Sequence, residues 1–155
     1  LATLAVPADR LGHSNYDEVS WWLEVYADGG ATASNATINV TYDDASTGNL
    51  AAIAVGGTLR ASRMIPLIPA VQGRLIKGIN TVILSASTGT AGNFGFTATR
   101  QKAVLPLDIA NRSQVFDWAQ IGHPNIPNDS CLQMIVQTPT TSTGTLRGAV
   151  KITNG

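Results

Sequence analysis

Cysteine, glutamate, histidine and lysine are all scarce in this 155-residue chain, which has one cysteine, two glutamates, two histidines and three lysines. A single cysteine excludes an intrachain disulfide, so the fold has to depend on its hydrophobic core. No run of the sequence approaches the roughly 18 to 20 apolar residues that cross a bilayer. Residues 1–6 are too short and too uncharged to form a complete signal peptide.

Charge is also low. Charged residues make up 13% of the chain, about half the usual share, and the formal net charge is zero. The basic surface of a nucleic-acid binder is therefore missing, and we predict neither a nucleic acid nor a membrane as partner. Weak charge repulsion suits a protein held in an assembly, although an ordinary, modestly soluble domain has the same composition.

The residues that usually carry catalysis do not cluster in the sequence. His13 and His123 lie far apart, and the chain has no Gly-x-Ser-x-Gly motif. The carboxylates Asp43 and Asp44 are expected in a turn, where an ordinary polar turn is favoured over a calcium site. Cys131 lies in an apolar run and is expected to be a small buried residue. We therefore predict no enzyme activity, no catalytic residue, no cofactor and no metal site.

Residues 19–26 have the alternation of a β-strand with a tryptophan on each face. Trp21 shares its face with apolar residues, as expected of a core position. Trp22 shares the other face with Ser20, Glu24 and Tyr26, which is a half-polar row. A large indole on such a face is costly to leave in water and tends to meet a partner. The alternative is that a loop, or the predicted helix around Trp118, covers Trp22 within the same domain.

Turn signals and apolar alternation recur along the rest of the chain. The only helix candidate covers residues 108–120. The prolines at positions 66 and 69 mark residues 64–69 as an edge strand or an extended segment. The expected strands are residues 19–26, 36–42, 50–55, 64–69, 79–86, 94–99, 130–138 and 145–153.

This pattern predicts an all-β protein with a single jelly-roll-like antiparallel β-sandwich and at most one short helix. Residues 1–18 form an extended N-terminal arm, and residues 19–155 form the sandwich domain. Such an arm is expected to pair with a sheet edge of its own domain or of a neighbour. The candidate interface residues are two apolar residues of the arm and two aromatic residues of the first long strand: Leu4, Val6, Trp22 and Tyr26.

Three runs of the sequence resemble structural proteins of tailed bacteriophages. They are WLEVYADGGATASNAT at residues 22–37, STGTAGNFG at 87–95 and LRGAVKI at 146–152. The resemblance is to the small jelly-roll cement, or decoration, proteins of phage heads, and it covers most of the chain after the arm. It implies a virion protein on the capsid exterior, made in the host cytoplasm. The implied partners are the major capsid protein and further copies of the chain, and the implied role is to brace the shell against the pressure of the packaged DNA.

Two other functions stay open from the sequence alone. A carbohydrate-binding module, for example in a phage tail or fibre, would use exposed aromatic rings to stack on sugars and Asn, Asp and Thr to bind hydroxyls. A small β-sandwich hydrolase is the third reading, and it is disfavoured because histidine and glutamate are so few.

Overall fold

The protein was analysed as a computed structural model that describes residues 4–6, 16–57, 59–89, 92–106, 112–126, 130–137 and 145–150. These residues contain eight β-strands in two antiparallel sheets and no helix. The predicted all-β antiparallel sandwich is confirmed. The strands are β1 (Leu4–Ala5), β2 (Val19–Ala27), β3 (Asn35–Tyr42), β4 (Thr47–Asn49), β5 (Ile53–Ala54), β6 (Met64–Pro66), β7 (Ile76–Leu84) and β8 (Asn93–Arg100).

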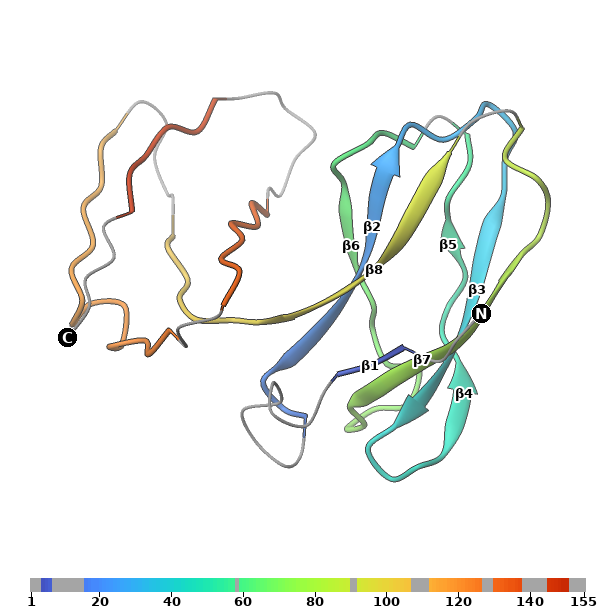
Figure 1. Cartoon of the computed structure of the whole chain (residues 1–155), viewed down its shortest axis with the longest axis horizontal. Helices are drawn as coiled ribbons and strands as arrows, with labels where there is room; N and C mark the ends of the chain where they lie inside the picture. Colours follow the sequence, from blue (N-terminus) through green and yellow to red (C-terminus); the bar gives the residue numbers. More distant parts are fainter. Residues whose placement is uncertain are drawn as a thin grey trace.

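The larger sheet has five strands, in the order β1-β7-β3-β4, with β5 paired to β3 as well. The smaller sheet has three strands in the order β6-β2-β8. The chain crosses repeatedly between the two sheets, which pack face to face (Figure 1). This arrangement is typical of jelly-roll-like sandwiches, in which strands distant in sequence become neighbours.

The core forms between β2 of the smaller sheet and β3 of the larger one. Alternate β2 side chains, Trp21, Leu23 and Val25, face inwards and are almost fully buried. Ile38 and Val40 of β3 are fully buried in the same cluster. The indole nitrogen of Trp21 donates a hydrogen bond of 3.0 Å to the carbonyl of Ile76 on β7, so one buried side chain joins the two sheets.

Tyr42 is the largest fully buried side chain, and its hydroxyl has no hydrogen-bond partner in the described part of the protein. A buried, unpaired hydroxyl costs about 1–3 kcal/mol. We therefore expect Tyr42→Phe to raise the free energy of unfolding by about 1 kcal/mol. Urea denaturation of the two proteins under the same conditions measures this change. A loss of stability would show that the hydroxyl has a partner.

Several local predictions are confirmed. The Trp strand and the strand at residues 36–42 appear as β2 and β3, and the proline-containing segment contributes the edge strand β6. Of the predicted strand at residues 50–55, only Ile53–Ala54 forms a strand, β5, although Leu50 and Val55 are buried as expected. The short strand β4 lies just before this span, at Thr47–Asn49.

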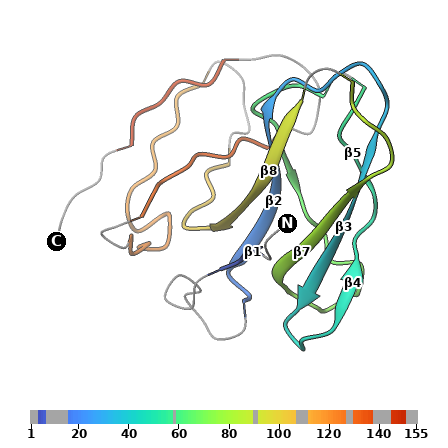
Figure 2. The same cartoon turned by 45° about the vertical axis from the view of Figure 1, so that its right-hand side comes forward.

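The predictions beyond residue 100 need correction. No strand occurs in the described parts of 130–138 and 145–153, namely residues 130–137 and 145–150. Residues 112–117 of the predicted helix have no regular structure, and the chain makes turns at 118–122. Residues 107–111 lie outside the described residues. After β8 the chain leaves the sandwich, and its described segments lie to one side of the two sheets (Figures 1 and 2). A strand needs a ladder partner, and these apolar runs have none in the described residues.

Candidate interaction surface

The outer face of the smaller sheet carries the half-polar row seen in the sequence. Because side chains alternate along a strand, Trp22, Glu24 and Tyr26 of β2 lie on the face opposite to the core. The register pairs Trp22 with Thr97 of β8 and with Pro66 of β6. The first long strand thus lies in the middle of this face, with one neighbour on each side.

Trp22 is covered within the chain, which agrees with the second of the two alternatives that the sequence left open. Only 8% of the residue is exposed. Its indole nitrogen donates a hydrogen bond of 2.8 Å to the hydroxyl of Thr99 on the neighbouring strand. Trp22 therefore stabilises the outer face of this sheet. Because its ring is buried, a partner cannot contact it unless neighbouring residues of this chain move away.

Tyr26 is the exposed aromatic residue of this face, with 53% of its surface in solvent. Its ring lies across Gly95 of β8, where a Cβ atom would come within 2.7 Å of the tyrosine hydroxyl oxygen. Glycine at this position lets the ring lie flat on the strand. Tyr26 is therefore held in place and accessible, as a binding aromatic should be.

Hydroxyl and carboxylate groups lie beside these aromatic residues. The Thr97 hydroxyl donates a hydrogen bond of 2.5 Å to Oε2 of Glu24. At the other end of the pair of strands, Arg100 of β8 donates to the Glu18 carboxylate, with 3.1 Å from its Nε. These contacts tie β8 to β2 on the outer face, in addition to the backbone ladder.

The two candidate residues of the arm lie on the other sheet. β1 pairs with β7, so the arm joins an edge of its own domain. Leu4 is 39% exposed, and Val6 is partly buried against the core. The close approach of the arm requires Gly78, because a Cβ there would lie 2.6 Å from the Leu4 carbonyl oxygen. The structure brings Trp22 and Tyr26 onto one face and places Leu4 and Val6 elsewhere.

Many large apolar side chains beyond residue 100 are exposed, which was not expected from the sequence. The aromatic member of this set is Trp118, which is 53% exposed and stacks on the His123 ring at 6.1 Å. Five of the aliphatic members lie in the strands predicted at residues 130–138 and 145–153, and Val115 lies in the predicted helix. The large apolar side chains exposed in this part of the chain are Val104, Leu105, Val115, Trp118, Leu132, Met134, Val136, Leu146 and Val150.

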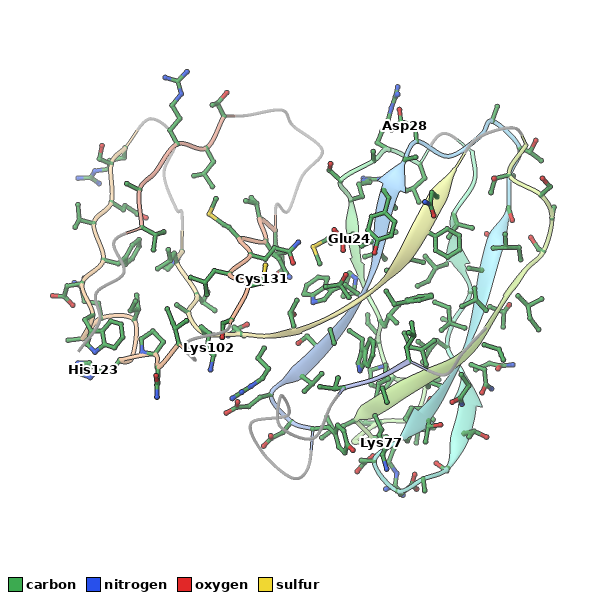
Figure 3. All side chains as sticks on the ribbon, in the orientation of Figure 1. Glu24, Asp28, Lys77, Lys102, His123 and Cys131 are labelled. Carbon is green, nitrogen blue, oxygen red and sulfur yellow. The ribbon has the colours of Figure 1, made fainter. Side chains whose placement is uncertain are left out.

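The cysteine, histidine and carboxylate side chains that could take part in catalysis or metal binding do not cluster in the described residues. Cys131 is exposed rather than buried, which corrects the prediction, and it lies well away from His123 (Figure 3). His13 lies outside the described residues. Within the described ranges, no three His, Cys, Asp or Glu side chains are grouped closely enough to hold a metal ion.

The carboxylates at positions 43 and 44 serve the turn after β3. Asp44 accepts hydrogen bonds from the hydroxyl and the backbone nitrogen of Ser46, at 2.6 and 3.0 Å. The hydroxyl contact is the main reason why the pKa of the Asp44 carboxyl lies below its usual value. Asp43 accepts from the backbone nitrogen of Leu75 at 3.1 Å, which ties this turn to the start of β7. These contacts fit the predicted polar turn.

No helix in the described ranges is long and apolar enough to span a membrane. Comparison with known proteins found no matching family model, no matching curated protein and no matching solved structure. The described surface carries an exposed tyrosine that lies across Gly95, a sheet face with threonine hydroxyls, and many exposed apolar side chains after residue 100.

Proposed function

We propose that this protein is a virion structural protein, a cement or decoration protein that binds the outer surface of a phage head and stabilises it. The observation that carries the proposal is the set of large apolar and aromatic side chains left in solvent, such as Tyr26, Trp118 and Met134. Extensive apolar surface on a small domain is typical of a protein that works within an assembly. The resemblance of residues 22–37, 87–95 and 146–152 to phage structural proteins points to the kind of assembly.

Binding to a shell explains how modest contacts could suffice. A symmetric capsid presents the same site many times, and neighbouring contacts raise the effective concentration of each additional one. The proposed partners are the major capsid protein and adjacent copies of this chain. The low overall charge fits binding through apolar area rather than through steering by charge.

The direct test is sedimentation of material from the native source, with mass spectrometry to detect this chain. Under the proposal, the protein travels with particles of virus size at a fixed copy number per shell. Purified protein added to shells that lack it should restore their resistance to heat. A protein that sediments alone and does not bind such shells would refute the proposal.

Tyr26 is the first residue to change. We expect Tyr26→Ala to weaken shell binding about tenfold per site, because exposed, rigid tyrosines are common anchors of interfaces. Its effect on the free energy of unfolding should stay below about 1 kcal/mol, as for most surface substitutions. Quantitative co-sedimentation measures the binding.

Ile83 of β7 provides the matched control, since it is 66% exposed on the other sheet. Ile83→Ala should leave shell binding unchanged. Equal losses for the two variants would mean that binding depends on general exposed apolar area and not on the Tyr26 face.

A carbohydrate-binding module is the second candidate. The observation in its favour is the position of Tyr26 beside the Thr97 hydroxyl and the Glu24 carboxylate, since an exposed ring next to polar groups can bind a sugar. A glycan array probed with the intact chain separates the two candidates. Specific glycan binding that Tyr26→Ala abolishes, without association with virus particles, would favour this alternative.

A further inference from the structure

Strand β8 forms an open edge of the smaller sheet. In the described part of the chain it has one neighbour, β2, and no strand pairs with its other side. β8 is eight residues long and contains no proline and no lysine. Its only charged residue, Arg100, lies at its end and is bonded to Glu18. Features that normally prevent strand addition at an edge are therefore missing.

The hydrogen bonds of β2 show which backbone N–H and C=O groups of β8 point away from β2 and are available to a further strand. The Trp21 carbonyl accepts from Leu67, and the Val25 nitrogen donates to the Arg63 carbonyl, so these β2 residues bond towards β6. In an antiparallel ladder, alternate residues bond to opposite sides. Trp22 therefore bonds towards its β8 partner, Thr97.

The same alternation continues along β8. The residues on either side of Thr97, Phe96 and Ala98, direct their N–H and C=O groups away from β2, as does Phe94. Unpaired groups of this kind form a template for a further strand.

The opposite edge of the sheet is protected. There β6 has three residues, and it ends in Pro66. Leu67 bonds inwards to β2, so Pro66 is an outward-facing position at which the N–H is missing. A short edge with proline is a poor template. Strand addition is therefore expected at β8 and not at β6.

Residues 130–137 match the open edge in length and pattern. Leu132, Met134 and Val136 alternate, and they are 48%, 71% and 53% exposed. Burying one side chain of this size contributes roughly 1.5–3 kcal/mol. The segment has no ladder partner in the described residues, although these three large apolar side chains share one face of it, as in a strand that buries that face.

The apolar row of this segment also fits the inner side of β8. Phe94 and Phe96 point inwards and are only partly buried, and Ala98 on the same side is exposed. At the Phe94 end, a recess of about 70 Å³ opens between the sheets, and Val55, Leu59 and Leu84 are among its lining residues. An added strand would place its apolar row beside these side chains.

Within one molecule, this segment lies at the wrong edge to pair with β8. The Gln133 side-chain amide donates to the sulfur of Met64 at 3.4 Å, which places residues 130–137 beside β6. β6 and β8 lie on opposite sides of β2, about 10 Å apart at the strand spacing of a sheet. A second copy can reach the β8 edge without this constraint.

We infer that the β8 edge binds residues 130–137 of a second copy of this chain, so that the smaller sheet gains a fourth strand across the interface. The backbone groups of Phe94, Phe96 and Ala98 pair with the incoming strand, and its row of Leu132, Met134 and Val136 covers the open inner side of β8. This inference specifies the contact between copies that the proposed function includes. Copies can associate with or without a shell, so measurements on the purified chain test this contact separately from binding to a shell.

The first test measures the mass of the full chain over a range of concentrations by sedimentation velocity. We expect an oligomer that dissociates on dilution. Ala98→Pro removes an outward N–H and leaves the β2 ladder intact, and Met134→Asp puts a charge into the incoming row. Each should raise the dissociation constant roughly tenfold or more, a loss of about 1.4 kcal/mol or more.

A second variant and a matched control distinguish a lost contact between copies from a misfolded chain. Met134 is 71% exposed, so Met134→Asp should leave the sandwich of the single chain intact even if Ala98→Pro does not. Gln137→Asp is the matched control, because it adds the same charge on the opposite face of the same segment. It should leave the dissociation constant unchanged.

The second test identifies the contact through disulfides between two single-cysteine chains. Both carry Cys131→Ser. One adds Ala98→Cys on β8, and the other adds a cysteine at position 132, 134 or 136. Since each chain has one cysteine, a heterodisulfide formed with copper phenanthroline in air must join two molecules. Thr81→Cys, exposed on β7, replaces Ala98→Cys as the control.

The expected result is a heterodisulfide with Ala98→Cys, strongest at one of the three positions and absent with Thr81→Cys. A single-chain mass at every concentration would overturn the inference. So would a dissociation constant that Met134→Asp leaves unchanged, or equal cross-linking from Ala98→Cys and Thr81→Cys.

Discussion

Replacing Gly56 with alanine is expected to destabilise the protein by about 3 kcal/mol or more, at the upper end of what overpacking causes. A Cβ at this position would lie 2.1 Å from the carbonyl oxygen of Thr32 and 2.7 Å from the backbone nitrogen of Ser34. Both are backbone atoms, so no side chain can rotate away. The Gly56 nitrogen also donates to the Ser34 carbonyl at 3.1 Å, and the displaced chain would lose this bond.

Gly57 supplies the control for this prediction. Its φ is +68°, and nothing lies within 4 Å of the position where a Cβ would be. Gly57→Ala therefore adds backbone strain of about 1–2 kcal/mol without a clash. Urea denaturation should rank Gly56→Ala as clearly the more damaging variant. The opposite order would mean that the approach of residues 32–34 to Gly56 is less close than described.

Trp21→Ala is expected to reduce the free energy of unfolding by about 4 kcal/mol, within the range for deleting a large buried aromatic side chain. Trp21 is 6% exposed and belongs to the central cluster. Its removal leaves a cavity between the sheets, and the Ile76 carbonyl loses its indole donor. Both effects act in the same direction.

Two further variants separate the loss of packing from the loss of the hydrogen bond and provide a control at an exposed tryptophan. Trp21→Phe keeps most of the packing and removes the hydrogen bond, so it should cost less than Trp21→Ala. Trp118→Ala removes the same kind of side chain from a site that is 53% exposed, and it should change stability by no more than about 0.5 kcal/mol. Tryptophan fluorescence and circular dichroism during denaturation report all three. A comparable loss for Trp118→Ala would place Trp118 in a packed core.

The strands before residue 100 could be predicted because their signals are local. The alternation in β3 puts Ile38, Val40 and Tyr42 on one face, and that face is buried. Pro66 marked β6 as an edge strand or an extended segment, because proline cannot donate to a ladder. In each case the pattern within a few residues determines which face can be buried.

The rest depended on contacts between distant segments. Residues 130–137 have a strand pattern, but a strand also needs a neighbour, and the sequence of one chain does not show whether that neighbour is available. The sequence left open whether Trp22 is exposed or covered, because its own strand face is half polar. Its burial depends on contacts across the sheet, such as the hydrogen bond to Thr99, 77 residues away. Cys131 was assigned to a core for the same reason as residues 130–137.

The pairing of β2 with β8 sets an order for folding during synthesis. Val19 pairs with Arg100, and Leu4 of β1 pairs with Ile79 of β7, so the first strands wait for partners made much later. A nascent chain that ends before residue 93 therefore exposes Trp21 and Trp22 on an incomplete sheet. Long-range pairing of this kind slows folding and prolongs the time in which apolar strands can aggregate. Because of this topology, we expect the nascent chain to depend strongly on chaperones until the ribosome has completed β8.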